Sequence, residues 1–276
     1  MTGGFRRTIA LAASVAFVAV ATGCAGAAPA MNAASPTVPD GSAVVTIAAA
    51  ADLKFALDEI VTLAEEEDSS LKIRVTYGSS GTFLQQIQNG APFDVFLSAD
   101  LSYPQLLVDA GLASEADLFP YAVGRLVLWV PEGSELNPED GMGVLLEPTV
   151  RRVSIANPEH APYGKAAVAA LQDSGLYDEV AEKFVLGENV AQAAEFVQSG
   201  NADAGIVAKS LVLSDPLKNE GAWAELPVDS YPRLDQGGVI LGDAAHPGGA
   251  RAFRDVMLSD AGTAILSRYG FELPEG

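Results

Sequence analysis

Cysteine and histidine are scarce in this chain, and their scarcity removes several kinds of site. Cys24 is the only cysteine, and His160 and His246 are the only histidines. The two histidines lie far apart in sequence, without the spacing of ligands on one helix or hairpin. A disulfide framework and a cysteine metal site are therefore excluded, and a zinc site is not expected.

Basic residues are also few. The chain has 16 Lys and Arg against 36 Asp and Glu, which gives a formal net charge of −20. No Lys/Arg patch interleaved with aromatic residues opposes that charge, so we expect no nucleic-acid partner. A bulk positive field cannot attract an anion to such a protein. An anion site must instead work through local dipoles inside a cleft.

The nucleophile elbow of serine hydrolases, Gly-x-Ser-x-Gly, is missing at the one place where serine and glycine cluster. In Gly78-Ser79-Ser80-Gly81 the glycines are wrongly spaced around either serine. We therefore expect no enzyme activity and no cofactor.

The N-terminus has the pattern of an export signal. Arg6 and Arg7 precede an unbroken run of apolar and small residues over 9–21. This run is shorter than a typical transmembrane helix. The run ends in Ala-Thr-Gly before Cys24, and this resembles a bacterial lipoprotein signal. The resemblance implies cleavage before Cys24 and a diacylglycerol group on its sulfur; a plain secretory signal with an incidental cysteine is the alternative.

Three segments follow from this interpretation. Residues 1–23 are the expected signal peptide, and 24–42, which are rich in Ala, Pro, Ser and Gly without periodicity, are a flexible tether. The mature domain begins near residue 43. We expect it to lie outside the cytoplasm, attached to the membrane through lipidated Cys24.

The mature domain alternates short apolar runs with amphipathic helical patterns, and no internal repeat is evident. This alternation predicts an α/β fold with largely parallel sheets. The expected strands are 44–48, 71–77, 93–97, 123–130, 152–156, 184–186, 204–207 and 239–241. The expected helices are 53–66, 83 up to a stop at 89–92, 101–110, 164–171, 191–198, 250–258 and 261–269, with a further one after Lys209.

The segment 77–82, Tyr-Gly-Ser-Ser-Gly-Thr, is a hydroxyl-rich turn between an expected strand and an expected helix. Ser80 or Ser79 can sit at the mouth of that helix, beside free backbone N–H groups and the positive end of the helix dipole. This is how a protein holds an oxyanion without a cation. An ordinary helix N-cap is the alternative for this segment taken alone.

Three further strand-to-helix junctions have the same chemistry, at 50–52, 161–164 and 188–190. Such junctions lie beyond the carboxyl ends of strands, where α/β proteins collect ligands. Two junctions from each of two lobes would surround a small tetrahedral anion with neutral donors.

Four stretches resemble the periplasmic molybdate-binding proteins of ABC importers, in order along the chain from about Val44 to the C-terminus. The two most diagnostic are 90–100 and 157–164; the others are 48–53 and 78–82, with 205–207 and 268–271 also fitting.

The resemblance implies a two-lobed type II periplasmic-binding fold with a ligand cleft between the lobes. Lobe 1 is then 43–122 plus 238–276 and lobe 2 is 123–237, with the chain crossing near 121–125 and 234–238. The implied ligand is molybdate or tungstate, and the implied partner is a membrane permease. We expect a monomer.

The family's oxyanion contacts fall on Asp52, Ser80, Tyr163, Val190 and Ala208, with Ser79 beside them. Backbone N–H groups serve at Tyr163 and Val190, so side-chain identity matters little there. Two positions depart from the family, which commonly has Ser at Asp52 and Tyr at Ala208. Losing that tyrosine hydroxyl weakens binding by about 1–3 kcal/mol.

Asp52 has two interpretations, because a carboxylate beside a dianion is repulsive. We favour an outward side chain that caps the following helix while the backbone N–H meets the ligand. The alternative is that Asp52 selects an anion that carries a proton, such as phosphate or arsenate. A signalling or scaffold domain that has lost the site is the alternative from another functional class.

Overall fold

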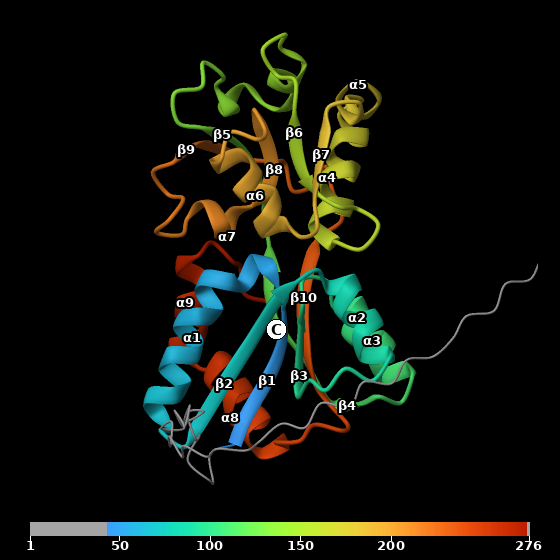
Figure 1. Ribbon diagram of the computed structural model, residues 1–276, viewed down its shortest axis with the longest axis vertical. Helices are drawn as coiled ribbons and strands as arrows, with labels where there is room; N and C mark the ends of the chain where they lie inside the picture. Colours follow the sequence, from blue (N-terminus) through green and yellow to red (C-terminus); the bar gives the residue numbers. More distant parts are fainter. Residues whose placement is uncertain (1–42, 275–276) are drawn as a thin grey trace, which may run out of the picture. The chain divides into compact units, whose positions relative to one another are not determined.

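Two five-stranded sheets organise residues 43–274, which are the residues that the computed structural model describes (Figure 1). The expected signal peptide, the tether and Cys24 lie outside the described residues. The strands are β1 (Ala43–Ala50), β2 (Leu71–Gly78), β3 (Val95–Ser98), β4 (Ala113–Gly124), β5 (Leu126–Pro131), β6 (Val153–Ala156), β7 (Phe184–Gly187), β8 (Ala204–Ala208), β9 (Gly221–Glu225) and β10 (Leu234–Leu241).

Helices connect most of the strands. The α-helices are α1 (Lys54–Glu67), α2 (Ser80–Gln88), α3 (Ser102–Asp109), α4 (Pro162–Asp173), α5 (Tyr177–Ala181), α6 (Val190–Gln198), α7 (Lys209–Val212), α8 (Pro247–Met257) and α9 (Asp260–Arg268). Three short 3-10 helices are η1 (Ala51–Leu53), η2 (Pro138–Asp140) and η3 (Met142–Leu146).

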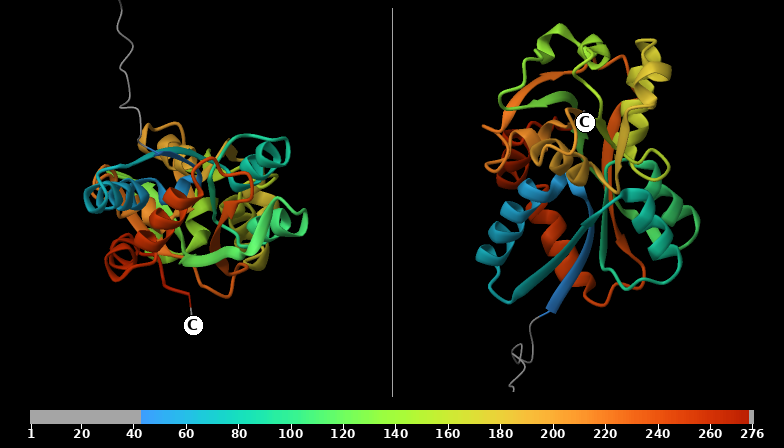
Figure 2. Two further views of the ribbon diagram at one scale, coloured as in Figure 1. Left: turned by 90° about the horizontal axis from the view of Figure 1, so that it is seen from below. Right: turned by 45° about the horizontal axis from the view of Figure 1, so that its top comes forward.

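The first sheet has the order β2-β1-β3-β10-β4, with β1, β2 and β3 parallel and β10 antiparallel to both neighbours. Side chains alternate across β1, so that Val45, Ile47 and Ala49 pack into one core cluster and Ala48 into another. Helices α1, α8 and α9 pack together on one side, and α2 and α3 on the other (Figure 2). Because helices cover both faces of the sheet, the sequence of β1 is an almost continuous run of apolar residues.

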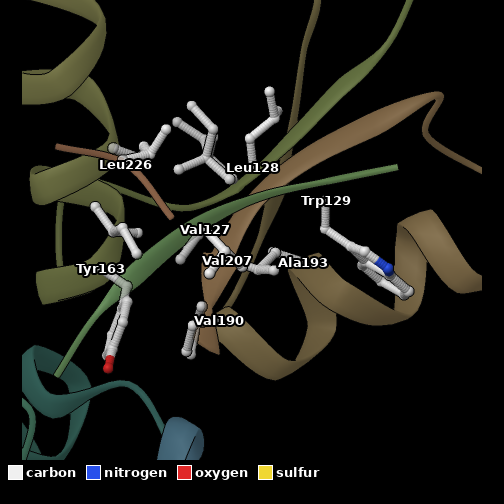
Figure 3. Packing of buried hydrophobic residues seen from close by; sticks show 14 of the residues in the cluster. Val127, Leu128, Trp129, Tyr163, Val190, Ala193, Val207 and Leu226 are labelled. Atoms are coloured by element: carbon white, nitrogen blue, oxygen red, sulfur yellow. The ribbon is translucent and has the colours of Figure 1, made fainter. Parts of the chain in front are cut away.

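The second sheet has the order β7-β6-β8-β5-β9, with β6, β7 and β8 parallel and β5 antiparallel to both neighbours. Consecutive residues Val127, Leu128 and Trp129 of β5 are all fully buried, so this strand is also covered on both faces. Figure 3 shows their side chains among those of β8 and α6. The predicted α/β architecture with two lobes is confirmed, each lobe being one sheet and the helices around it.

The chain passes from the first sheet to the second between β4 and β5, with Arg125 as the only residue between these strands. The prediction of one strand over 123–130 was therefore wrong. The chain returns between β9 and β10. Near the C-terminus, Glu272 forms a β-bridge with Val123 and an ion pair with the Arg125 side chain. These two contacts hold the C-terminal segment against the first crossing.

Most predicted elements are present, but β9 and α5 were not predicted, and β4 begins well before the predicted strand. None of the helices within residues 43–274 combines the length and apolar content needed to cross a bilayer.

Candidate functional site

A small cavity of about 10 Å³ lies where the carboxyl ends of strands from both sheets approach one another. All four of the predicted strand-to-helix junctions contribute to it. Its lining residues are Ala50, Ala51, Asp52, Gly78, Ser79, Ser80, Ala99, Ala161, Pro162, Tyr163, Asn189 and Val190. The structure thus brings together segments that are up to about 140 residues apart in sequence, and it does so at the edge where α/β proteins bind ligands.

Helix N-termini surround this cavity. Helix α2 begins at Ser80, α4 at Pro162 and α6 at Val190, while η1 supplies the fourth helical start. The first N–H groups of a helix have no partner within it, and the helix dipole places partial positive charge there. The lining contains no Lys, Arg or His among the described residues. Any anion in this cavity is therefore held by neutral donors.

Ser80 offers the clearest side-chain donor. Its side chain is buried, and its Oγ accepts a hydrogen bond of 3.0 Å from the backbone N–H of Ala99. Because a hydroxyl both accepts and donates, the Ser80 proton remains available to an acceptor in the cavity. Ala99 lies directly after β3, so the same contact ties α2 to that strand.

Ser79 differs from Ser80 in the direction of its hydroxyl proton. Its hydroxyl donates to the backbone oxygen of His160 at 2.6 Å, and the Nδ1 of His160 lies 2.9 Å from the same Oγ. Ser79 lines the cavity, but its proton is directed to the other lobe rather than to a ligand. The nearby N–H of Gly81 donates to the same His160 oxygen at 2.9 Å.

Asp52 does not turn outward, so the favoured interpretation of an exposed helix cap was wrong. Asp52 lies within η1 and makes no side-chain cap, and the residue is 1% exposed. Its Oδ2 accepts a hydrogen bond of 2.6 Å from Nε2 of Gln236, a residue of β10. Burial raises the pKa of the Asp52 carboxyl to about 6, and hydrogen bonds from Gln236 and Tyr163 offset only part of that effect.

Tyr163 contributes to the site through its backbone and through its side-chain hydroxyl. Its backbone lies in the first turn of α4 at the cavity. In Figure 3 its ring points away from the labelled aliphatic side chains, with the hydroxyl at the far end. That hydroxyl accepts a hydrogen bond of 3.2 Å from Gln236 Nε2. Burial, with the nearby Asp52 charge, raises the pKa of Tyr163 well above its usual range, so its hydroxyl keeps its proton.

Val190 lies at the cavity, and the preceding Asn189 fixes its geometry. The Oδ1 of Asn189 accepts from the N–H groups of Ala191 and Gln192, at 3.0 and 3.1 Å. The cap satisfies these two N–H groups, and Val190, the first residue of α6, lines the cavity.

Ala208 is the predicted site residue that does not line the cavity. It is fully buried at the end of β8, where it pairs with Leu126. Two residues later, the Ser210 hydroxyl donates to the backbone oxygen of Asp52 at 2.7 Å. In place of a ligand contact, this part of the second lobe holds the backbone of η1.

Gln236 is the important residue that sequence reasoning missed. It is fully buried, and its amide joins Asp52 of the first lobe to Tyr163 of the second. A polar residue before Gly237-Gly238 at the start of an apolar strand was the available signal. No group of three or more His, Cys, Asp or Glu side chains in the described part of the chain is arranged to hold a metal ion.

Comparison with known proteins places the chain in a family. The family model described as bacterial extracellular solute-binding protein matches residues 45–272. The chain belongs to this family.

Two relatives and one solved structure illustrate the similarity. The molybdate-binding protein ModA of Rhodobacter capsulatus is 36% identical over 85% of this chain and 90% of its own length. A putative ABC transporter substrate-binding lipoprotein of Bacillus subtilis, YvgL, is 31% identical over 96% of this chain and 97% of its own length. The structure of the Azotobacter vinelandii periplasmic molybdate-binding protein matches with a TM-score of 0.78 and 32% identity, covering 84% of this chain and all of that one.

The match in structure confirms the two-lobed type II periplasmic-binding fold for this solute-binding protein.

Proposed function

We propose that this protein is the substrate-binding component of an ABC importer for a tetrahedral oxyanion, with molybdate as first choice and tungstate nearly equal. One observation carries the proposal: four helical N-termini from two lobes converge on one cavity whose lining has no cation. Neutral donors and helix dipoles suit a small, fully desolvated anion. The names of the Rhodobacter capsulatus and Azotobacter vinelandii proteins support molybdate in particular.

In this proposal the anion contacts are the Ser80 hydroxyl and backbone N–H groups at Asp52, Ser80, Tyr163 and Val190. Ser79 belongs to the site as a lobe-to-lobe contact, and Ala208 is not part of it. Molybdate and tungstate have nearly the same size and charge, so these donors do not separate them. Smaller sulfate would leave some donors at imperfect distances.

Uptake would follow a hinge mechanism. A void of about 10 Å³ is near the smallest space that holds one water molecule, so the lobes must separate to admit an oxyanion. The crossings at Arg125 and between β9 and β10 are the connections about which they would turn. The closed, loaded form would then dock to a membrane permease, with no chemistry on the ligand.

The proposal includes the export signal. Residues 1–23 would be removed, and Cys24 would carry the lipid that holds the protein, as a monomer, on the outer face of the membrane. The name of the Bacillus subtilis relative, a lipoprotein, supports the anchor. Residues 24–42 would then be the tether, and 43–122 with 238–276 and 123–237 the two lobes.

Thermal unfolding of the full chain with separate oxyanions tests the proposed ligand. Ligand at about one hundred times its dissociation constant stabilises the folded state by about 2.7 kcal/mol, a shift of several degrees. We expect that shift with molybdate and tungstate and a smaller one with sulfate. No shift with any oxyanion would overturn the proposal and favour a signalling or scaffold domain.

A second candidate ligand is an anion that carries its own proton, such as phosphate or arsenate. The buried Asp52 carboxyl at the cavity favours it, because an ionised carboxylate can accept that proton in a hydrogen bond. A larger thermal shift with phosphate or arsenate than with molybdate would establish this alternative.

A further inference from the structure

Two buried oxygen atoms near the cavity have no hydrogen-bond partner. Within the described residues, Oδ1 of Asp52 and Oε1 of Gln236 are both buried and unpartnered, although the two side chains are joined through Oδ2 and Nε2. Both side chains are almost completely buried. Buried oxygens are normally satisfied, so this arrangement is missing a donor.

Asp52 lies in the cavity lining itself, where an ionised carboxylate would repel a dianion. The titratable groups that face it are Tyr163 from α4 and Tyr121 from β4, and both stay neutral because burial raises their pKa values well above the usual range. Tyr231 is near Tyr163, and the neutral Ser210 of α7 donates a hydrogen bond to the Asp52 backbone oxygen.

The charged residues on the surrounding elements do not neutralise Asp52. Lys54 of α1 pairs with Asp58, Lys209 of α7 with Glu225, and Arg125 at the crossing with Glu272. Glu195 of α6 is exposed. The carboxyl therefore has no cation beside it that would compensate its charge when a dianion enters.

We propose that Asp52 takes up one proton from solvent each time a dianion binds, and that its protonated Oδ1 then donates to a ligand oxygen while Gln236 holds Oδ2. This assignment rests on the proposed function. It gives Oδ1 a hydrogen-bond partner and converts the one repulsive group of the lining into an attractive one.

The affinity for a dianion should depend on pH, because ligand binding is linked to protonation of Asp52. Burial already raises the pKa of Asp52 to about 6 without ligand, and a bound dianion raises it further, so the bound form holds more protons. Above about pH 6 the dissociation constant should therefore rise by about tenfold for each pH unit, until the pKa of the bound form is reached.

Calorimetric titration of the full chain with molybdate tests this assignment. At about pH 7, titrations in buffers of different ionisation enthalpy should show uptake of close to one proton per molybdate, and the dissociation constant should increase about tenfold between about pH 7 and 8. Asp52→Asn, whose amide is a permanent donor, should bind with no proton uptake and a flat pH profile. Asp52→Ser serves as a second neutral variant, and Asp229→Asn, at an exposed position, should keep the wild-type slope.

Each contrary outcome has a distinct meaning. Molybdate binding with no proton uptake, or an unchanged slope in Asp52→Asn, overturns the Asp52 assignment and leaves the proposed function standing. An affinity for phosphate that rises with pH places the proton on the ligand and also overturns it. No molybdate binding at any pH overturns the proposed function, and the assignment with it.

Discussion

Ser79 and His160 contact each other twice across the cleft, although they are 81 residues apart in sequence. The Ser79 hydroxyl donates to the His160 carbonyl oxygen, and it lies within hydrogen-bond distance of the ring. Since the serine proton is directed to the carbonyl, the ring Nδ1 acts as the donor in the second contact. The N-terminus of α2 in the first lobe is thereby held against the loop after β6 in the second, next to the cavity.

Gly81 provides the most specific test of closure. A Cβ at this position would lie 2.6 Å from the His160 carbonyl oxygen, which belongs to the opposite lobe. Gly81→Ala should therefore oppose closure and raise the dissociation constant for molybdate by about tenfold or more, equivalent to about 1.4 kcal/mol. Because alanine is the better helix former, the melting temperature of the free protein should stay the same or rise slightly.

Gly143→Ala is the matched control, since a Cβ there meets nothing within 4 Å and should leave the affinity unchanged. Equal affinities for Gly81→Ala and the wild type, measured by calorimetry, would show that the two lobes do not approach this closely when ligand is bound.

His160→Ala removes the ring contact to Ser79 and leaves the carbonyl contacts in place. One neutral hydrogen bond contributes about 0.5–1.5 kcal/mol, so we expect about a two- to tenfold weaker affinity. The change should appear mainly in the dissociation rate, because the contact stabilises the closed state. Stopped-flow measurement of ligand release checks this, with His246→Ala as the control; an unaltered release rate would remove His160 from the closing contacts.

Ser80→Ala deletes a buried hydroxyl whose proton is available to an acceptor in the cavity. Hydrogen bonds to charged groups contribute about 1.5–3 kcal/mol, so the affinity for molybdate should fall by about ten- to a hundredfold. Some loss of stability is also expected, because the Ala99 N–H loses its buried acceptor. Exposed Ser267→Ala is the control. A calorimetric titration that gave wild-type affinity for Ser80→Ala would exclude its hydroxyl as a ligand.

Asp52 should also make the stability of the ligand-free protein depend on pH. Its pKa rises from 3.8 to about 6 on folding, so between these values the folded state holds more protons than the unfolded state. Stability is therefore lost as the pH rises through this window, by about 3 kcal/mol at pH 7.

Asp52→Asn cannot ionise, so it should be more stable than the wild type at pH 7 by up to about 3 kcal/mol and equally stable below about pH 4. Denaturant unfolding at both pH values measures the difference, with Asp229→Asn as the control. A variant that is less stable at pH 7 would contradict the raised pKa of the buried carboxyl.

The sequence predicted what depends on local pattern. Periodicity gave most strands and helices, and the small residues at strand ends gave the four junctions that the structure brings together. Apolar residues on both sides of Arg125 concealed the break between β4 and β5, because the residues read as one continuous strand while they belong to two sheets. The part of β4 before Tyr121 contains Pro120 and the acidic residues Glu115 and Asp117, and its pattern is not that of a buried strand.

The orientation of Asp52 was not predictable in the same way. Its position depends on Gln236, which lies 184 residues away in sequence. Position beside a helix start favours an outward cap for an aspartate, and only the packing of β10 and α4 against η1 reverses that expectation. The family resemblance likewise carried a ligand contact to Ala208, where the structure has a buried strand end instead.

The location of a bound heavy oxyanion tests the central claim most directly. Crystals of the protein grown with tungstate would give an anomalous signal from the tungsten. The expected result is one strong peak between the lobes, with tungstate oxygens within hydrogen-bond distance of the Ser80 hydroxyl and of backbone N–H groups at Tyr163 and Val190. A peak elsewhere on the protein, or no peak between the lobes at saturating tungstate, would contradict the claim that these helix N-termini form an oxyanion site.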